Sequence, residues 1–229
     1  MKSTRRLIIH GAGGFGAEVL WIARAVNEAA AFDFVWDPIG FSDDNPSLKG
    51  TQRHGLKVLG TCQEMVAEFG SQEVWFHCAI GVNTQRFRTA GILELGGLKA
   101  ATLIHPSVVM AGDAEVKEGC LVAPFVVLAP SSKVGRHVII NTHVGVGHHS
   151  QVGDFVNLCP GARVSGGCFI DKCAFMGSNS VLHPGKTMGE GATLGPNSYA
   201  IRSMAPRVTA MGVPARIVSR PASNESPAV

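Results

Sequence analysis

The sequence predicts two domains of different architecture, an α/β domain over residues 1–103 and an all-β parallel β-helix over residues 104–220. Strand and helix patterns alternate through the first hundred residues, whereas an aliphatic side chain returns at every sixth position from Ile104 onward. Glycine is frequent, at 28 of 229 residues, which is typical of tightly turning β structure. Hydrophobic residues make up 45% of the chain and charged residues 16%, so a sizeable core is expected.

A short apolar strand opens the first domain and leads into a glycine-rich turn, Gly11-Ala-Gly-Gly-Phe-Gly16, and then into a helix with apolar residues from Val19 to Val26. Thr61 and Glu64 have the spacing of a capping box, which predicts a short helix. The other predicted elements are strands at 6–9, 35–41, 73–80 and 101–104 and a helix at 83–95. Because strands and helices alternate with short loops, the sheet is expected to be parallel.

The second domain is predicted by a repeat of six residues. Sixteen consecutive hexads, which begin at Ile104 and end with the one that begins at Leu194, start with an aliphatic residue or Met. The fifth residue of each hexad is small or β-branched, with Lys186 as the exception. A period of six fits neither an ordinary strand nor a helix, and it indicates a hexapeptide β-helix in which three hexads make one triangular coil of eighteen residues. The aliphatic position would fill the interior, and the small position would fit the tight corner.

Charge and cysteine content exclude several function classes. The net charge of +3 and the lack of a Lys/Arg block argue against nucleic acid and an acidic membrane surface as partners. No apolar run approaches the ~20 residues of a membrane span, and no signal-peptide core is present, so a cytoplasmic location is expected. None of the six cysteines forms a Cys-x-x-Cys pair, and buried free thiols are expected. The polar tail at 221–229 is expected to be disordered.

The hexads resemble those of left-handed β-helix acyltransferases, and Met211-Gly-Val-Pro-Ala-Arg-Ile-Val218 resembles their exit segment. With the α/β domain in front, the chain resembles the NeuD/PglD-type sugar acetyltransferases. The segments that carry this resemblance are Ile9–Gly16, Gly40–Asp44, Ile80–Arg86, Leu103–Ser107 and Ile140–Asp154. The resemblance implies a Rossmann-like nucleotide-sugar-binding domain, a left-handed β-helix and a homotrimer. It also implies acetyl-CoA as co-substrate, with no metal, and N-acetylation of a 4-amino sugar as the expected reaction.

The glycine-rich turn has a physical interpretation of its own, since Gly11, Gly13 and Gly16 would let backbone amides approach a phosphate at a helix N-terminus. A plain tight turn between strand and helix is the alternative. The resemblance assigns nucleotide-sugar binding to Gly13, Gly14, Phe15, Asp43 and Asp44. For the acidic pair, a solvated turn is the alternative.

His148 is the candidate catalytic residue. It is the third residue of its hexad, and because the first and fifth positions point inward, its side chain should project from the coil near a corner. The resemblance implies that His148 is the general base, for which an imidazole is suited near neutral pH, and that Asn141 orients it or contacts substrate. His149 stands where the family usually has Asp or Glu, so the usual charge-assisted partner is missing. A surface histidine and a corner asparagine are the alternatives.

The resemblance places the CoA cleft at Asn157, Ser178 and Pro196. At Pro196 only main-chain contacts are expected, and a backbone N–H is not available for them.

Three other functions stay open. The first is O-acetylation of a sialic acid or polysaccharide sugar. The second is zinc-dependent hydration of the γ-carbonic-anhydrase kind, for which His143 and His148 have suitable spacing but His105 lies two residues out of register. The third is a non-enzymatic scaffold, which would not require the glycine turn and the histidine together.

Overall fold

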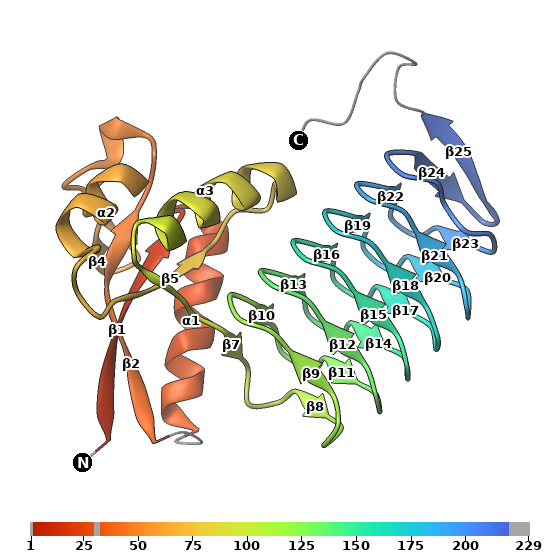
Figure 1. The fold of residues 1–229 in the computed structure, drawn as a ribbon, viewed down its shortest axis with the longest axis horizontal. Helices are drawn as coiled ribbons and strands as arrows, with labels where there is room; N and C mark the ends of the chain where they lie inside the picture. Colours follow the sequence, from red (N-terminus) through yellow and green to blue (C-terminus); the bar gives the residue numbers. More distant parts are fainter. Residues whose placement is uncertain (1, 30–32, 220–229) are drawn as a thin grey trace. The chain divides into compact units, whose positions relative to one another are not determined.

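The computed structural model describes residues 2–29 and 33–219, and the chain divides into two compact units that are treated separately (Figure 1). The first comprises Met1–Val108 with Lys117–Pro124, and the second comprises Val109–Val116 with Phe125–Val229. The two units alternate along the chain between residues 108 and 125. The domain boundary expected between residues 103 and 104 therefore stays a prediction. The tail predicted at 221–229 lies outside the described residues.

The first unit contains a parallel sheet of four strands in the order β2-β1-β5-β6. They are β1 (Ser3–His10), β2 (Phe34–Ser42), β5 (Trp75–Cys78) and β6 (Lys99–Ala100). The strands predicted at 6–9, 35–41 and 73–80 are therefore confirmed, with shifted ends. The apolar centre of β1 is fully buried, as expected of a strand covered on both faces.

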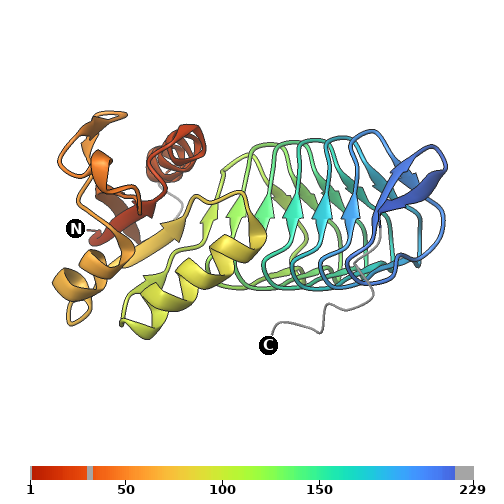
Figure 2. The ribbon, with the colours of Figure 1, turned by 90° about the horizontal axis from the view of Figure 1, so that it is seen from above.

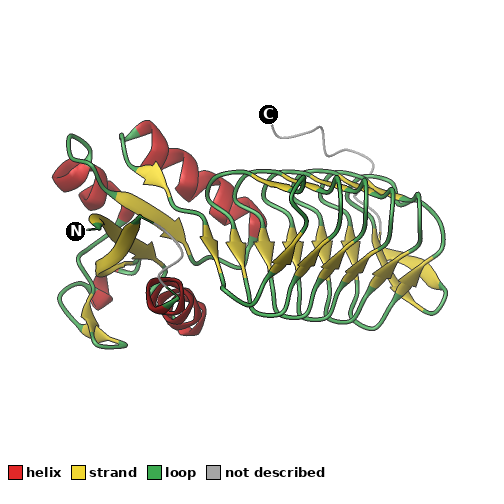
Figure 3. Cartoon of the chain, turned by 90° about the horizontal axis from the view of Figure 1, so that it is seen from below, coloured by secondary structure: helices red, strands yellow, loops and turns green. Residues whose placement is uncertain are grey.

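Three α-helices cover this sheet, with α1 (Gly14–Glu28) on one side and α2 (Cys62–Phe69) and α3 (Asn83–Leu95) on the other (Figures 2 and 3). The predicted capping box is confirmed: the Thr61 side chain accepts from the Glu64 backbone N–H, and the Glu64 carboxylate accepts from the Thr61 N–H. Helix α3 has the bounds that the sequence predicted. Val19, Leu20 and Ile22 of α1 are buried in the core of the unit.

The strand predicted at 101–104 was wrong in its placement. The fourth strand of the sheet is Lys99–Ala100, and Leu103–Ile104 forms a separate strand, β7, which pairs with β10 (Leu121–Val122). Leu103 and Ile104 follow the hexad register, so their ladder partners lie eighteen residues later rather than in the α/β sheet. The sequence also gave no sign of the short hairpin of β3 (Gln52–Arg53) and β4 (Leu56–Lys57), or of the 3-10 helix η1 (Pro46–Leu48).

The second unit is a stack of triangular coils with one sheet on each face, as the hexads predicted (Figures 1 and 3). Strands pair in parallel with the strand one coil later, so that Val127 faces Gly145 and Lys133 faces Gln151, eighteen residues on. The first face contains β13 (Ile139–Ile140), β16 (Asn157–Leu158), β19 (Phe175–Met176), β22 (Thr193–Leu194) and β24 (Thr209–Gly212). The second face contains β8 (Val109–Met110), β11 (Val127–Leu128), β14 (Gly145–Val146), β17 (Arg163–Val164), β20 (Val181–Leu182) and β23 (Tyr199–Ala200). The third face contains β9 (Glu115–Val116), β12 (Lys133–Val134), β15 (Gln151–Val152), β18 (Phe169–Ile170) and β21 (Thr187–Met188).

Burial follows the hexad as predicted. The aliphatic positions are buried from Val122 onward, and the fifth positions are buried from Cys120 onward except at half-buried Lys186. The fourth position provides a feature that the sequence analysis missed, because from Gly119 onward it adopts the left-handed conformation in every hexad, with φ near 58° at His149. Each corner is thus a tight turn, closed at one of them by a hydrogen bond from Ser150 N–H to the Gly147 carbonyl at 3.3 Å.

The last coil is shorter than the others. Thr193 pairs with Thr209, sixteen residues later, and β24 then turns back into the antiparallel strand β25 (Ala215–Ser219). This hairpin contains the exit segment that the sequence analysis singled out.

Within the two described stretches, no helix is long and apolar enough to cross a lipid bilayer. All six cysteines are free, and four of them are buried.

Candidate active site

The glycine-rich turn joins β1 to α1 in the first unit, and two of its glycines are required by the turn itself. Gly11 has a left-handed backbone at φ 109°, and a Cβ there would lie 2.6 Å from the carbonyl oxygen of Ala79. A Cβ at Gly16 would collide with the carbonyl oxygen of Gly11. These two positions therefore need glycine for packing, whether or not a ligand binds.

Gly13 and Gly14 differ from these two, because no protein atom lies within 4 Å of a Cβ built at either position. Both are exposed, and neither has a positive φ that would favour glycine. Gly13 is the N-cap of α1, yet no side chain caps the helix, and its first turn contains no acidic residue. The start of α1 thus leaves free space beside Gly13 and Gly14, and phosphate binding at this turn stays a prediction.

Both carboxylate oxygens of Asp43 accept backbone hydrogen bonds, one of them from the glycine-rich turn. Its Oδ2 accepts the Ala12 N–H at 3.0 Å, and its Oδ1 accepts the Asn45 N–H at 3.0 Å. The side chain therefore ties the end of β2 to the glycine-rich turn, and a bound ligand would have to use the remaining lone pairs of the carboxylate.

Asp44 is tied to a buried network that the sequence analysis missed. Its Oδ1 accepts the N–H of Cys62 at the start of α2, at 2.9 Å, and its Oδ2 lies 3.8 Å from Nε2 of His10. Nδ1 of His10 is 2.9 Å from Oγ of Ser42, and both of these residues are buried. Burial lowers the pKa of His10, although the charges of Asp44 and Asp43 oppose the shift. The signal available in the sequence was a polar residue at the end of each of two apolar strands.

Burial, together with a hydrogen bond to Asp44, raises the pKa of Cys62 to about 11, so its thiol is protonated at neutral pH. Phe15, the remaining predicted residue of the turn, is half-buried and packs against the core of the unit. Its role in substrate binding stays a prediction.

The segment Ile80–Arg86 is structural. Arg86 is buried, and its Nη1 donates to the carbonyl oxygen of Ile80 at 2.7 Å. This contact ties the start of α3 to the loop that follows β5.

The second candidate site lies in the second unit, on the corner that follows its second face. His148 and His149 are the two central residues of the turn, and both are exposed as predicted. Their Nδ1 atoms are 3.0 Å apart, and their rings meet edge to face with centroids 5.3 Å apart. One Nδ1 must carry a proton and the other must accept it, because an imidazole nitrogen does one or the other in its neutral form. The bond leaves Nε2 of His148 outside the pair.

The glycine one coil above makes room for the His148 ring. A Cβ at Gly166 would lie 2.5 Å from Nε2 of His148 and 2.7 Å from its Cε1. The imidazole therefore rests over the main chain of the next coil, whose Gly167 N–H donates to the carbonyl of His148 at 2.8 Å. A side chain at Gly166 could not share this space.

The other predicted residues of this unit lie along a different corner, the one that follows the first face. Asn141 is half-buried, and its Oδ1 accepts the Thr142 N–H at 2.9 Å. Asn157 is buried on the first face, Ser178 is half-buried in the corner above it, and Pro196 lies one coil above Ser178. In the described part of the chain, no hydrogen bond or ring contact joins Asn141 to His148. One β-helix thus keeps the histidine pair apart from the residues predicted to bind CoA.

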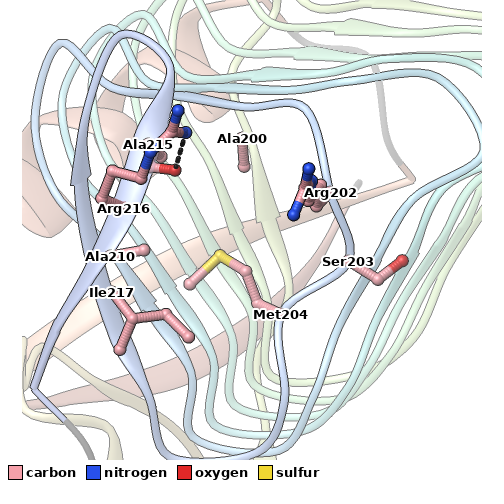
Figure 4. A pocket seen from close by; sticks show the side chains of 8 residues that line it. All are labelled: Ala200, Arg202, Ser203, Met204, Ala210, Ala215, Arg216 and Ile217. Carbon is pink, nitrogen blue, oxygen red and sulfur yellow. Dashed lines mark hydrogen bonds between the residues drawn. The ribbon is translucent and has the colours of Figure 1, made fainter.

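A cavity of about 420 Å³ lies at the C-terminal end of the stack (Figure 4). It exists because Ala200 and Ala210 stand at inward positions that lower coils fill with larger residues, such as Leu182 and Leu194. Arg202 and Arg216 line it, together with the apolar side chains of Met204 and Ile217, and no carboxylate is among the lining residues. An anion with an apolar portion would suit this lining.

A zinc site has little support in the geometry. The His143 ring packs against the Phe125 ring one coil below it, with centroids 5.0 Å apart and the planes tilted by 32°. Over residues 2–29 and 33–219, no three His, Cys, Asp or Glu side chains converge as metal ligands.

Comparisons with known proteins find relatives of this chain in both sequence and structure. Residues 6–92 match the family model of the PglD N-terminal domain. The chain is 29% identical over 178 residues to a GDP-perosamine N-acetyltransferase from Escherichia coli O157:H7, an alignment that covers 77% of each protein.

Solved structures extend the likeness to both domains. The acetyltransferase domain of PglB from Neisseria gonorrhoeae is 26% identical with a TM-score of 0.84, covering 93% of this chain and 100% of that one. PerB from Caulobacter crescentus, in complex with CoA and GDP-perosamine, is 27% identical with a TM-score of 0.82, covering 93% and 97%. The predicted fold class, an α/β domain followed by a left-handed β-helix, is confirmed.

Proposed function

The chain is an acyltransferase similar to the NeuD/PglD-type sugar acetyltransferases, and from this premise we propose that it acetylates the amino group of a nucleotide-linked 4-amino sugar with acetyl-CoA. The observation that carries the proposal is the exposed His148–His149 pair, in which a ring-to-ring hydrogen bond leaves Nε2 of His148 available to a substrate. PerB, a structural relative, binds the nucleotide sugar GDP-perosamine together with CoA.

In the proposed reaction, Nε2 of His148 takes a proton from the sugar amine as the amine nitrogen attacks the thioester carbonyl carbon. For Nε2 to accept, Nδ1 of His148 must carry the proton of the pair, so His149 is the acceptor in the competent tautomer. The new C–N bond replaces the C–S bond, and CoA leaves as a thiolate that takes the proton back from the imidazolium. No acyl-enzyme is needed, and a hydrogen-bond donor near the thioester would stabilise the oxyanion.

The α/β unit would hold the nucleotide part of the substrate. The open amides at Gly13 and Gly14 fit a diphosphate at the start of α1. Asp43 and Asp44 would take part in two ways, by fixing the turn through their amide contacts and by offering their remaining lone pairs to hydroxyl or base groups.

Acetyl-CoA would lie along the β-helix with its thioester at His148. Asn157, Ser178 and Pro196 remain the proposed contacts for the pantetheine arm. The cavity with Arg202 and Arg216 is a further candidate for the phosphate end of CoA, because its two guanidinium groups lack a lining carboxylate.

A homotrimer is proposed because His148 and the proposed CoA residues occupy different corners of one β-helix, so a neighbouring copy would be needed to bring them together. The second face, which separates the two corners, carries exposed Val109 and Val127, at 65% and 46% of full exposure, and these side chains are suited to an interface. The free thiols fit a cytoplasmic protein.

The test is a panel of UDP-, GDP- and CMP-linked sugars offered with acetyl-CoA, with product mass and CoA release as readouts. A 4-amino sugar nucleotide should be acetylated, whereas its 4-hydroxy analogue should not react. Acetylation of the hydroxyl analogue or of free sialic acid would favour the O-acetyltransferase alternative. If no member of the panel reacts, and acetyl-CoA does not bind, the proposal fails.

A further inference from the structure

His148, the proposed general base, is hydrogen-bonded to the neutral imidazole of His149 rather than to a carboxylate. When His148 takes a proton, the positive charge is shared across the Nδ1–Nδ1 bond with His149, and a neutral imidazole supplies no counter-charge. A carboxylate near the pair would favour the protonated state and would make His148 a stronger base. The surrounding corner shows where such a carboxylate lies.

The corner that holds the pair, called here the histidine corner, runs through five coils. Its turn residues are, from the lowest coil upward, Gly112 and Asp113, Pro130 and Ser131, His148 and His149, Gly166 and Gly167, and Pro184 and Gly185. Among these turn residues the titratable groups are the two imidazoles and the carboxylate of Asp113, and the guanidinium of Arg202 follows one coil above Pro184. His149 and Ser131 occupy equivalent positions one coil apart, and the His149 N–H donates to the neighbouring Pro130 carbonyl at 3.0 Å.

Asp113 is anchored beneath the pair. Its Oδ2 accepts the hydroxyl of Ser131 at 2.8 Å, and its carboxylate also accepts a backbone hydrogen bond from Ser131. These bonds, and to a lesser extent the charge of His149, lower the pKa of Asp113. Asp113 is thus ionised at neutral pH and is turned toward the next coil by Ser131, and it lies two coils below His149 in the same corner.

We propose that Asp113, oriented by Ser131, is the counter-charge of the His148–His149 pair. The proposal rests on the proposed function, because it assigns the support of the same general base. Asp113 does not touch the substrate or the reacting atoms. It is a positioning residue that acts through the electric field at His149, and it favours the charged state of the pair after proton transfer.

The expected effect is small, because the carboxylate is exposed and water and salt screen its field. Replacing it by Asn should move the acidic limb of the kcat/KM profile to lower pH by on the order of half a unit at low ionic strength. Raising the salt to about 1 M, where the Debye length is about 3 Å, should remove most of the difference.

The experiment compares Asp113→Asn, Ser131→Ala and Glu115→Gln in the full chain. Glu115 is the matched control, because it lies two residues from Asp113 in the same coil but faces Lys133 at 3.0 Å on the third face. Two readouts are recorded at low and high salt, the pH profile of kcat/KM and the NMR titration of the ring protons of His148 and His149.

Asp113→Asn should lower both midpoints, Ser131→Ala should lower them by less, and Glu115→Gln should leave them near the wild-type values. Equal midpoints in Asp113→Asn and wild type, or an equal shift in Glu115→Gln, would overturn the proposal. The NMR titration does not depend on turnover, so a shift seen in a protein that transfers no acetyl group would reject the proposed function and leave the electrostatic coupling standing.

Discussion

At the glycine-rich turn, the polar side chains are bound to the main chain, whereas at the histidine corner the two imidazoles are bound to each other and are otherwise exposed. Asp43 and Asp44 accept backbone N–H groups from Ala12 and Cys62, and His10 is buried behind them. His148 and His149 share one hydrogen bond and border open space.

This difference fits a division of labour between binding and proton transfer. A turn fixed by its own hydrogen bonds can present amides to a phosphate without rearrangement, which suits a binding site. An exposed imidazole pair can change its protonation state at little cost, which suits a general base. Substitutions at the turn should therefore act on KM for the sugar nucleotide, and substitutions at the corner should act on kcat.

The largest effect is expected for His148→Ala. Removing the general base should lower kcat by roughly 10²–10⁴-fold, and acetyl-CoA affinity should barely change, since the imidazole is not expected to hold the pantetheine arm. The matched control is His54→Ala, an exposed histidine of the turn between β3 and β4 in the α/β unit, and it should retain near-wild-type kcat. Steady-state kinetics and acetyl-CoA titration calorimetry provide the two readouts.

His149→Ala checks which histidine of the pair is the base. It should cost much less than His148→Ala, because His149 accepts from the base rather than from the substrate. An inactive His149→Ala with an active His148→Ala would mean that the roles are reversed. If both variants stay active, the reaction takes place elsewhere.

Gly13→Val tests the turn. The backbone at Gly13 is extended, with φ −87° and ψ −165°, so Val fits the fold but its branches fill the open space in front of the amides. KM for the sugar nucleotide should rise roughly 10- to 100-fold, the equivalent of one lost charge-assisted hydrogen bond, while acetyl-CoA affinity stays unchanged. Gly91→Val in α3, where a Cβ also meets nothing within 4 Å, is the control. An equal loss of acetyl-CoA binding would contradict the assignment of the α/β unit.

Gly166→Ala should have an intermediate effect on kcat. The new Cβ would occupy the place of the His148 ring, and the ring, as the end of a flexible side chain, can swing away without unfolding the coil. Loss of its orientation should reduce kcat roughly tenfold, with little change in melting temperature. Gly112→Ala, three coils below Gly166 at the equivalent corner position and with free space around its Cβ, should be neutral in both measurements.

The fold was largely predictable from the sequence because the hexad repeat leaves a strong periodic signal. Leu158, Val164 and Ile170 point inward as expected, since every coil must bury the same position. The strand predicted at 101–104 was misplaced because these apolar residues could extend the α/β sheet or begin the β-helix. Only their pairing with residues eighteen positions later decides between the two.

The exposure of one candidate residue was predictable from the sequence, whereas the contacts of the candidate residues were not. The exposure of His148 followed from its place in the hexad. The hydrogen bond between the two imidazoles depends on side-chain rotamers. The contacts of Asp44 depend on His10 and Cys62, which come from other parts of the chain. Such contacts arise from tertiary packing and have no local sequence signal.

The smallest effect is expected for His149→Asp, which places a carboxylate next to His148. A negative charge at that distance favours the imidazolium, so the acidic limb of the kcat/KM profile should move to higher pH, by less than about one unit for an exposed pair. The backbone tolerates the change, because position 149 has a left-handed φ of 58° and Asp adopts this conformation more readily than most residues. His149→Asn is the control, since it fits the same turn without the charge and should leave the limb unshifted or move it to lower pH. If Asp and Asn shift the limb equally, the charge beside His148 does not control its basicity, and the comparison between a fixed binding turn and a titrating corner loses its electrostatic basis.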